Sequence, residues 1–315
     1  MSSSPAPLPV ASPAALTAQH GVTPLPHLGV IRAQGEDAAK FLHGQLTQDF
    51  VLLGLGEARL AGFCSAKGRL LSSFVGFKQA PDDILLVCSR DVLPATLKRL
   101  SMFVMRAKAR LSDASETFQV WGLVGSAAPK QAQLWSKTGE ADGAQTVQIY
   151  PADGVERALW VAPTGLTPPA GERLPEALWH WLEVRSGVAN ITQPIVEAFV
   201  PQMLNYESVG GVNFKKGCYP GQEVVARSQF RGTLKRRAYL VHSAEALSVG
   251  QDVFHESDAE QPCGTVAAAA PHPDGGWDAI VSLQTSATAG GQLRAGSAGG
   301  ALTLLPLPYP LLDDI

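Results

Sequence analysis

The sequence has little charge and little cysteine, and each shortage excludes a class of protein. Charged residues make up 17% of the 315 positions, and the formal net charge is −3. A general nucleic-acid coat protein would be strongly basic instead. The four cysteines are Cys64, Cys88, Cys218 and Cys263. They form no C-x-x-C pair, so their spacing indicates neither a disulfide scaffold nor a zinc knuckle. We therefore expect a cytoplasmic protein that does not bind nucleic acid directly.

Long apolar runs are also missing. No stretch approaches the roughly 18 uninterrupted apolar residues that a membrane-spanning helix requires. Residues 1–26 are rich in Ser, Pro and Ala and contain no Lys or Arg, so the positive start of a secretory signal is absent. We interpret them as a disordered tail and expect no membrane association.

Signatures of metal, nucleotide and serine-hydrolase sites do not occur in the right context. The seven histidines do not cluster along the chain. His180 lies between Trp179 and Trp181, an arrangement more typical of a packed or capped side chain than of a metal ligand. The sequence therefore predicts no metal site.

What is present is enough hydrophobic sequence for two or three packed units, since 45% of the residues are hydrophobic. The first unit begins with a strand at 29–33 and an amphipathic helix at 38–46. Strand-like runs at 58–64 and 69–77 follow, joined by a turn at 65–68, which is a hairpin pattern. A strand is also expected at 84–88 and a helix at 92–104.

Two further units follow. Strands at 118–124, 146–150 and 158–161, with a helix at 129–137, give a β-α-β-β order that resembles part of a ferredoxin-like split sandwich. From residue 240 onward, short strands alternate with Gly, Pro and Asp, which predicts a small β-barrel or sandwich. The fold class is α+β.

The segment from Asn213 to Arg227 carries the strongest chemical pattern. Gly217 and Gly221 bracket Cys218, which favours a turn of defined shape. Lysines 215 and 216 precede the cysteine, and nearby cations stabilise the reactive thiolate. The basic residues of the wider window are Lys215, Lys216, Arg227, Arg231, Lys235, Arg236 and Arg237. They suit an anionic ligand such as a folate glutamate tail or a phosphate, but a structural cysteine on a solvated basic face fits the same pattern.

A helix at 174–188 places its two tryptophans on different sides. Trp181 falls on the apolar stripe and is expected in the core. Trp179 lies roughly 140° from the middle of that stripe, near Glu183. Such a residue needs another partner, either the ring of a bound pterin or a neighbouring domain.

The run Lys216-Gly217-Cys218-Tyr219-Pro220-Gly221-Gln222-Glu223 resembles the K-G-C-[FY]-x-G-Q-E signature of the YgfZ family. Residues 41–49 are similar to its G-Q-[LV]-T-x-D segment, residues 64–68 to its C-D-x-K-G turn, and 201–211 and 226–232 to the approach and exit of the signature. The likeness runs from about Leu28 to Pro308. The family comprises folate-binding proteins that are implicated in iron–sulfur cluster assembly or repair and, through it, in tRNA thiolation.

The resemblance implies a site and a domain plan. Cys218 would be the reacting residue. The residues expected to bind tetrahydrofolate, or a one-carbon derivative of it, are Trp179, Asn205, Lys216, Gly217, Gln222, Glu223 and Arg227. The domains would be 27–111 plus 172–235, an inserted ferredoxin-like unit at 112–171 and a C-terminal barrel at 236–315. Folate would lie in the central opening with Cys218 at its rim, and the family's second tryptophan falls on Leu28. We expect a monomer whose partners are iron–sulfur client or assembly proteins.

The related glycine-cleavage T-protein suggests a second function, aminomethyl transfer to tetrahydrofolate. That enzyme relies on a D-D pair where this chain has Ser72 and Ser73. Serine does not ionise near neutral pH, so aminomethyl transfer is not expected. A third hypothesis is a non-catalytic scaffold that docks client proteins through a basic strip, formed by the seven basic residues from Lys215 to Arg237.

Overall fold

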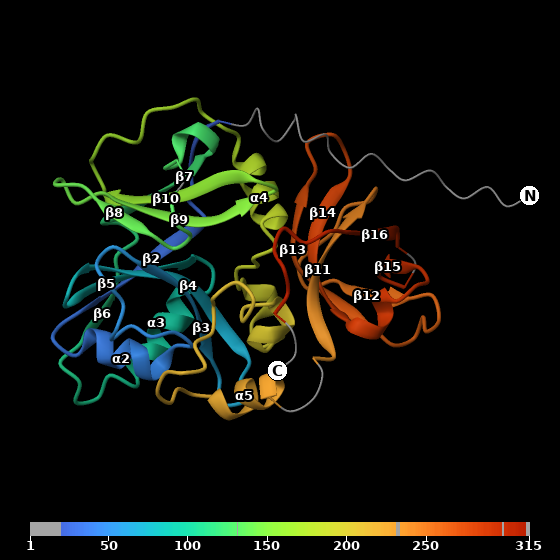
Figure 1. Cartoon of the computed structure of the whole chain (residues 1–315), viewed down its shortest axis with the longest axis horizontal. Coiled ribbons are helices and arrows are strands. Elements are labelled where there is room, and N and C mark those ends of the chain that lie inside the picture. The colour runs from blue at the N-terminus through green and yellow to red at the C-terminus, as the bar shows by residue number, and fades with distance from the viewer. Residues whose placement is uncertain (1–19, 131, 231–233, 298, 313–315) are drawn as a thin grey trace, which may run out of the picture.

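The computed structural model describes residues 20–130, 132–230, 234–297 and 299–312. Two five-stranded sheets lie beside a closed six-stranded barrel, with helix α4 (Glu176–Arg185) between them (Figure 1). No helix among the described residues is long and apolar enough to cross a membrane.

The first sheet is antiparallel and has the order β3-β4-β5-β2-β6. Its strands are β2 (Leu28–Gln34), β3 (Ala58–Cys64), β4 (Leu70–Ala80), β5 (Asp83–Ser89) and β6 (Arg110–Asp113). Because side chains alternate between the faces of a strand, Ile31 and Leu86 pack against helices α2 (Ala38–Gln45) and α3 (Leu93–Ser101), while Val30 and Val87 face the second sheet. The predicted hairpin and helices are confirmed.

The second sheet has the order β1-β7-β10-β9-β8 and is antiparallel throughout. Its strands are β1 (Gly21–Pro24), β7 (Phe118–Val124), β8 (Lys137–Gly139), β9 (Gln145–Ala152) and β10 (Val155–Pro163), and a 3₁₀ turn, η1 (Gly125–Ala127), follows β7.

Two predictions fail in the second sheet. The disordered tail was expected to reach residue 26, but β1 pairs with β7 from Gly21 to Pro24, and Val22 is buried there. Residues 1–19 lie outside the described part of the chain. The helix expected at 129–137 is also wrong, since the described residues there form turns that lead into β8. The ferredoxin-like arrangement stays a prediction.

The predicted C-terminal barrel is confirmed. Its strands follow the closed order β11-β14-β13-β12-β15-β16. Their bounds are β11 (Arg236–Ser243), β12 (Asp252–His255), β13 (Gly264–Pro271), β14 (Trp277–Gln284), β15 (Leu293–Ala295) and β16 (Ala301–Leu305), with η4 (Thr285–Thr288) after β14. Val241, Val253 and Val281 are among the residues that fill its interior.

Helix α4 connects the layers through a buried polar network. Arg185 is paired with Asp153 at the β9–β10 turn and lies 3.5 Å from Asp278 of the barrel. Trp181 donates a hydrogen bond to Asp278 at 2.8 Å, and His242 Nδ1 lies 2.8 Å from the second oxygen of the same carboxylate. Asp278 therefore holds three partners while its side chain is fully buried.

Candidate functional site

Three segments that lie far apart in the sequence meet around residues 215–221, the loop that carries Cys218. Gly221 has a φ of +79°, and a Cβ atom built on it would lie 2.4 Å from the carbonyl oxygen of Ser65 and 2.6 Å from Gly68 Cα. The turn after the thiol therefore packs backbone to backbone against the turn at 65–68. Helix α5 (Gln222–Phe230), which the sequence did not predict, begins directly after it.

Replacing Gly221 by alanine should therefore loosen this junction. The left-handed backbone costs an ordinary residue about 1–2 kcal/mol, and the overlap with Ser65 and Gly68 adds to it. We expect Gly221→Ala to lower the free energy of unfolding by about 2–4 kcal/mol, measured by denaturant titration. Gly165 has a φ of +103° with nothing within 4 Å of the added carbon, so Gly165→Ala is the control for backbone strain alone. Equal losses in both variants would contradict the packing argument.

The segment at 41–49 supports the loop from the other side. The hydroxyl of Thr47 donates to Gly211 O at 2.6 Å, and the amide of Gln48 donates to Gly210 O at 2.6 Å. A Cβ at Gly217 would lie 3.2 Å from His43 Nε2. The other ring nitrogen of His43 lies 3.0 Å from the carboxylate of Asp49. An oriented imidazole thus packs beside the residue that precedes the thiol.

Lys216 is the buried cation of the loop. Its ammonium donates to Leu46 O at 3.0 Å and Gly217 O at 3.1 Å, and it lies 4.6 Å from the centre of the Tyr219 ring. Burial lowers the pKa of Lys216 to about 8, although the charges of Asp49 and Cys218 oppose the shift. Lys216 therefore fixes the loop on helix α2 instead of forming part of an exposed basic face.

Cys218 differs from the other three cysteines because its side chain is exposed, whereas Cys64, Cys88 and Cys263 are buried. Burial raises the pKa of the Cys64 thiol to about 12 and also raises the pKa of Cys88. A reagent in solution therefore meets one accessible thiol per chain.

A thiol titration should reflect this difference. Under native conditions we expect Ellman's reagent to modify about one thiol quickly, and all four after unfolding, because burial blocks the attack at the others. Cys218→Ser should abolish the fast phase, and Cys263→Ser should leave it unchanged. A fast phase that persists in Cys218→Ser would show that a different thiol is accessible.

The remaining residues expected at the site do not converge on one ligand. Glu223 and Arg227 are exposed on α5, and Gln222 is partly buried at its start. Asn205, after η3 (Pro201–Leu204), is buried, and its amide nitrogen donates to Ala238 O and Tyr309 Oη. Asn205 Nδ2 thus makes two hydrogen bonds inside the protein, and the expected folate contact of Asn205 stays a prediction.

The predicted basic strip is interrupted as well. Arg237 is buried and paired with Glu207 at 2.8 Å, and Lys216 is buried in the loop. Arg231 lies outside the described residues. These facts weaken the scaffold hypothesis.

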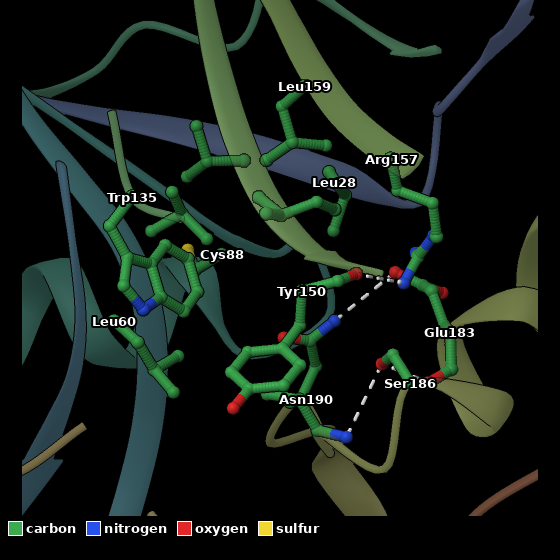
Figure 2. Close-up of a pocket in the computed structure, with 14 residues that line it drawn as sticks. Leu28, Leu60, Cys88, Trp135, Tyr150, Arg157, Leu159, Glu183, Ser186 and Asn190 are labelled. Atoms are coloured by element: carbon green, nitrogen blue, oxygen red, sulfur yellow. Dashed lines mark hydrogen bonds between the residues drawn. The ribbon is translucent and has the colours of Figure 1, made fainter. Parts of the chain in front are cut away.

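Two adjoining cavities occupy the centre of the molecule, between the sheets, α4 and the barrel. The inner one encloses about 50 Å³ and has apolar walls that include Leu28, Trp135 and Leu159 (Figure 2). The outer one encloses about 440 Å³ and reaches the barrel at 267–269. The residues that line both are Leu28, Glu183, Val188 and Asn190. Cys218 and Trp179 line neither cavity, and their expected place beside a folate stays a prediction.

Polar groups gather where the cavities meet. Asn190 Nδ2 donates to the Glu183 carboxylate at 3.3 Å. Burial alone would raise the pKa of Glu183, but the hydrogen bond from His180 and the charges of His27, Arg157 and His180 outweigh it and hold the pKa below its ordinary value. The junction therefore presents an ionised carboxylate within largely apolar walls.

Arg157 lies behind this carboxylate and is itself supported by Trp179. Its guanidinium sits 4.4 Å from the centre of the Trp179 ring, and burial lowers the pKa of Arg157 to about 10. Trp179 is 1% exposed, and a Cβ at Gly122 of β7 would lie 2.3 Å from its ring. The side of α4 that carries Trp179 was expected to meet a bound pterin or a neighbouring domain, and the second sheet covers it. Of the two partners left open for Trp179, the structure provides the neighbouring sheet.

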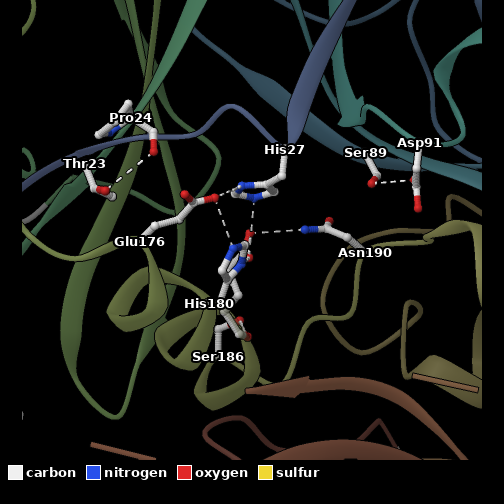
Figure 3. Close-up of polar contacts among 10 residues, drawn as sticks. Thr23, Pro24, His27, Ser89, Asp91, Glu176, His180, Ser186 and Asn190 are labelled. Atoms are coloured by element: carbon white, nitrogen blue, oxygen red, sulfur yellow. Dashed lines mark hydrogen bonds and ion pairs between the residues drawn. The ribbon is translucent and has the colours of Figure 1, made fainter. Parts of the chain in front are cut away.

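The sequence did not predict a site role for Glu183, Arg157 or Asn190. Glu183 could have been found, because it lies on the same side of the helix as Trp179. The histidines are scattered along the sequence, but the fold brings two of them together. The ring centres of His27 and His180 lie 4.4 Å apart (Figure 3).

Comparison with known proteins places these features in a family. No family model matches the chain. The chain is 32% identical over 301 residues to the tRNA-modifying protein YgfZ of Edwardsiella ictaluri, and the match covers 89% of each chain. It is 30% identical over 302 residues to the protein of that name from Photorhabdus laumondii, and that match covers 91% of each chain. The solved aminomethyltransferase T of the glycine cleavage system from Bartonella henselae has the same fold, with a TM-score of 0.67 and 16% identity over 95% of this chain and 88% of that one. The chain belongs to the YgfZ family.

Proposed function

We propose that the protein binds tetrahydrofolate or a one-carbon derivative in the central cavities and acts, through Cys218, as an accessory factor in iron–sulfur cluster assembly or repair. An effect on tRNA modification would then be indirect. The name of its relatives, tRNA-modifying protein, supports the last part. The family and the accessible thiol support the rest.

The observation that carries the folate proposal is the position of the Glu183 carboxylate, at the junction of the cavities. A reduced pterin presents a ring N–H and an exocyclic amino group side by side, and a carboxylate accepts both. Glu183 offers this acceptor pair, and the inner walls offer apolar contact. The outer cavity, at about 440 Å³, falls in the range of small-molecule sites. Arg90 on its wall supplies a cation for the glutamate tail.

Aminomethyl transfer is the second candidate because the protein shares the fold of an aminomethyltransferase. Ser72 and Ser73 are both buried in β4, and the hydroxyl of Ser73 accepts a hydrogen bond from Ile191 N at 2.9 Å. Neither serine lines the two cavities. A carboxylate that would stabilise a charged amine is therefore missing from this hairpin, and we expect no turnover of an aminomethyl-lipoyl carrier.

Folate binding is tested by isothermal calorimetry with tetrahydrofolate under anaerobic conditions. We expect one site per chain, together with a change in Trp135 fluorescence, because Trp135 lines the inner cavity. Trp135→Phe should remove most of the fluorescence change but retain the heat. Absence of binding at millimolar folate would refute this part of the proposal.

The role of Cys218 is tested in cells that lack their own relative of this protein. The wild-type gene should restore the activity of iron–sulfur enzymes. Cys218→Ala should not restore it, while its tetrahydrofolate affinity stays within about twofold, because the thiol lines neither cavity. Replacing the exposed neighbour, as Lys215→Ala, is the control. Full rescue by Cys218→Ala would remove the thiol from the mechanism.

A further inference from the structure

Two histidines and one glutamate form a compact cluster beside the outer cavity, His27, His180 and Glu176 (Figure 3), and the carboxylate of Glu183 adjoins it. His27 lies in the connection between β1 and β2. Glu176, His180 and Glu183 lie on one face of α4, because residues at i, i+4 and i+7 share a face. His27 Nδ1 and His180 Nε2 lie 3.3 Å and 3.4 Å from the same oxygen of Glu176.

These separations match a metal-binding geometry. In a tetrahedral zinc site with bonds of about 2.0–2.1 Å, neighbouring ligand atoms are about 3.3–3.4 Å apart. The three candidate ligand atoms, one each from His27, Glu176 and His180, all lie within 4.8 Å of one another. An ion between them would have three protein ligands and one open position, as zinc has in catalytic sites.

Glu183 adds a second, independent feature. Its carboxylate lies 3.2 Å from His180 Nδ1 and 3.8 Å from His27 Nε2, the ring nitrogens that face away from Glu176. Histidine ligands usually donate their other ring nitrogen to a carboxylate, which fixes the tautomer and the ring orientation. The Nε2 atom of His27 is buried and makes no hydrogen bond among the described residues. Glu183 thus orients the His180 imidazole by a hydrogen bond and lies within ion-pair distance of the unpartnered His27 nitrogen.

We infer that His27, His180 and Glu176 bind a divalent transition metal ion of the zinc class, with Glu183 as the orienting outer carboxylate. Two imidazoles and one carboxylate suit zinc, cobalt or nickel better than magnesium or calcium, which prefer oxygen ligands. Glu176 is 44% exposed, so an ion reaches the site from solvent. Because His27 and His180 also line the outer cavity, the open position serves a water or an anionic group bound there. The metal site shares Glu183 and the outer cavity with the proposed folate site, but metal binding is measured without folate.

The experiment measures metal binding by the metal-free, full-length protein in a Cys218→Ser background, so that the exposed thiol does not bind the ion. We expect one Zn²⁺ per chain with micromolar affinity or tighter by calorimetry. Added Co²⁺ should give the intense visible absorption of a tetrahedral site. His180→Ala and Glu176→Gln should each weaken binding at least about 10-fold, and Glu183→Gln about 10- to 100-fold.

The controls separate this site from others and from misfolding. His255 is hydrogen bonded in the barrel to Ser257 and Gly290 O, and His255→Ala should bind zinc as the parent does. Glu176 is half-exposed, so Glu176→Gln should fold, which thermal unfolding without metal verifies. Zinc should raise the melting temperature of the parent and not of Glu176→Gln. The inference would be overturned if the parent bound no zinc, or if Glu176→Gln and His180→Ala bound zinc as tightly as the parent.

Discussion

Replacing Asp278 by alanine is expected to lower the free energy of unfolding by about 3–5 kcal/mol, because it removes one partner of a buried charge network. The carboxylate is fully buried and interacts with Arg185, Trp181 and His242. Without it, Asp153 is the one charged partner left to Arg185 among the described residues, and the indole N–H of Trp181 loses its acceptor. An unsatisfied buried donor adds its own penalty.

Thermal unfolding followed by circular dichroism measures this effect. At an unfolding entropy of about 2.1 cal/mol/K per residue, a loss of this size lowers the melting temperature of the 315-residue chain by about 5–8 °C. The matched control is Asp274→Ala, which removes the same charge from the exposed turn of the same hairpin and should change the melting temperature by no more than about 1–2 °C. Asp278→Asn keeps an acceptor for Trp181 but loses the charge, so it should fall between the two. Equal melting temperatures for Asp278→Ala and Asp274→Ala would show that the network contributes nothing to stability.

Local patterns predicted most of the strands and the first two helices. The hairpin of β3 and β4 was predicted because a short turn joins two strand-like runs, and these two strands pair with each other. The barrel was predicted from the regular spacing of its turns, although its closure joins β11 to β16, about 60 residues apart in the sequence. In the hairpin, by contrast, the signal and the contact that it reports lie close together in the sequence.

The failures have the opposite cause. β1 pairs with β7, about a hundred residues away, and nothing within residues 21–24 announces that partner. Helix α4 was interpreted as having one buried face, whereas it lies between the second sheet and the barrel and buries Trp179 and Trp181 on different sides. A hydrophobic pattern shows how much of a helix is buried only when one layer covers it.

The same distinction applies to the site. The motif around Cys218 and the segments at 41–49 and 64–68 were found by resemblance, and the structure brings them together. The polar junction of the cavities combines Arg157 from β10, Glu183 from α4 and Asn190 from the segment after it. Each is an ordinary charged or polar residue in its own stretch of sequence, so only the fold shows that they meet.

Replacing Glu183 by glutamine is expected to weaken tetrahydrofolate binding about 10- to 100-fold. The carboxylate is the group that accepts both donors of the pterin, and a hydrogen bond to a charged group contributes about 1.5–3 kcal/mol. Glutamine keeps one acceptor oxygen but presents an amide donor to the second pterin donor, so one bond is lost and its position becomes repulsive. At about 1.4 kcal/mol for each factor of ten, the loss gives the stated range.

The measurement is a calorimetric titration in excess EDTA, so that a metal ion at His27 and His180 cannot contribute. Glu172→Gln is the matched control, since Glu172 is exposed just before α4 and lines neither cavity, and its affinity should equal that of the wild type. The pKa of Glu183 is held below its ordinary value, so the carboxylate stays ionised at neutral pH. Titration of Glu183 should therefore not change the wild-type affinity for tetrahydrofolate between about pH 6 and 8. If Glu183→Gln binds folate as tightly as Glu172→Gln, the pterin does not lie at the junction of the cavities, and the folate site must be sought elsewhere on the molecule.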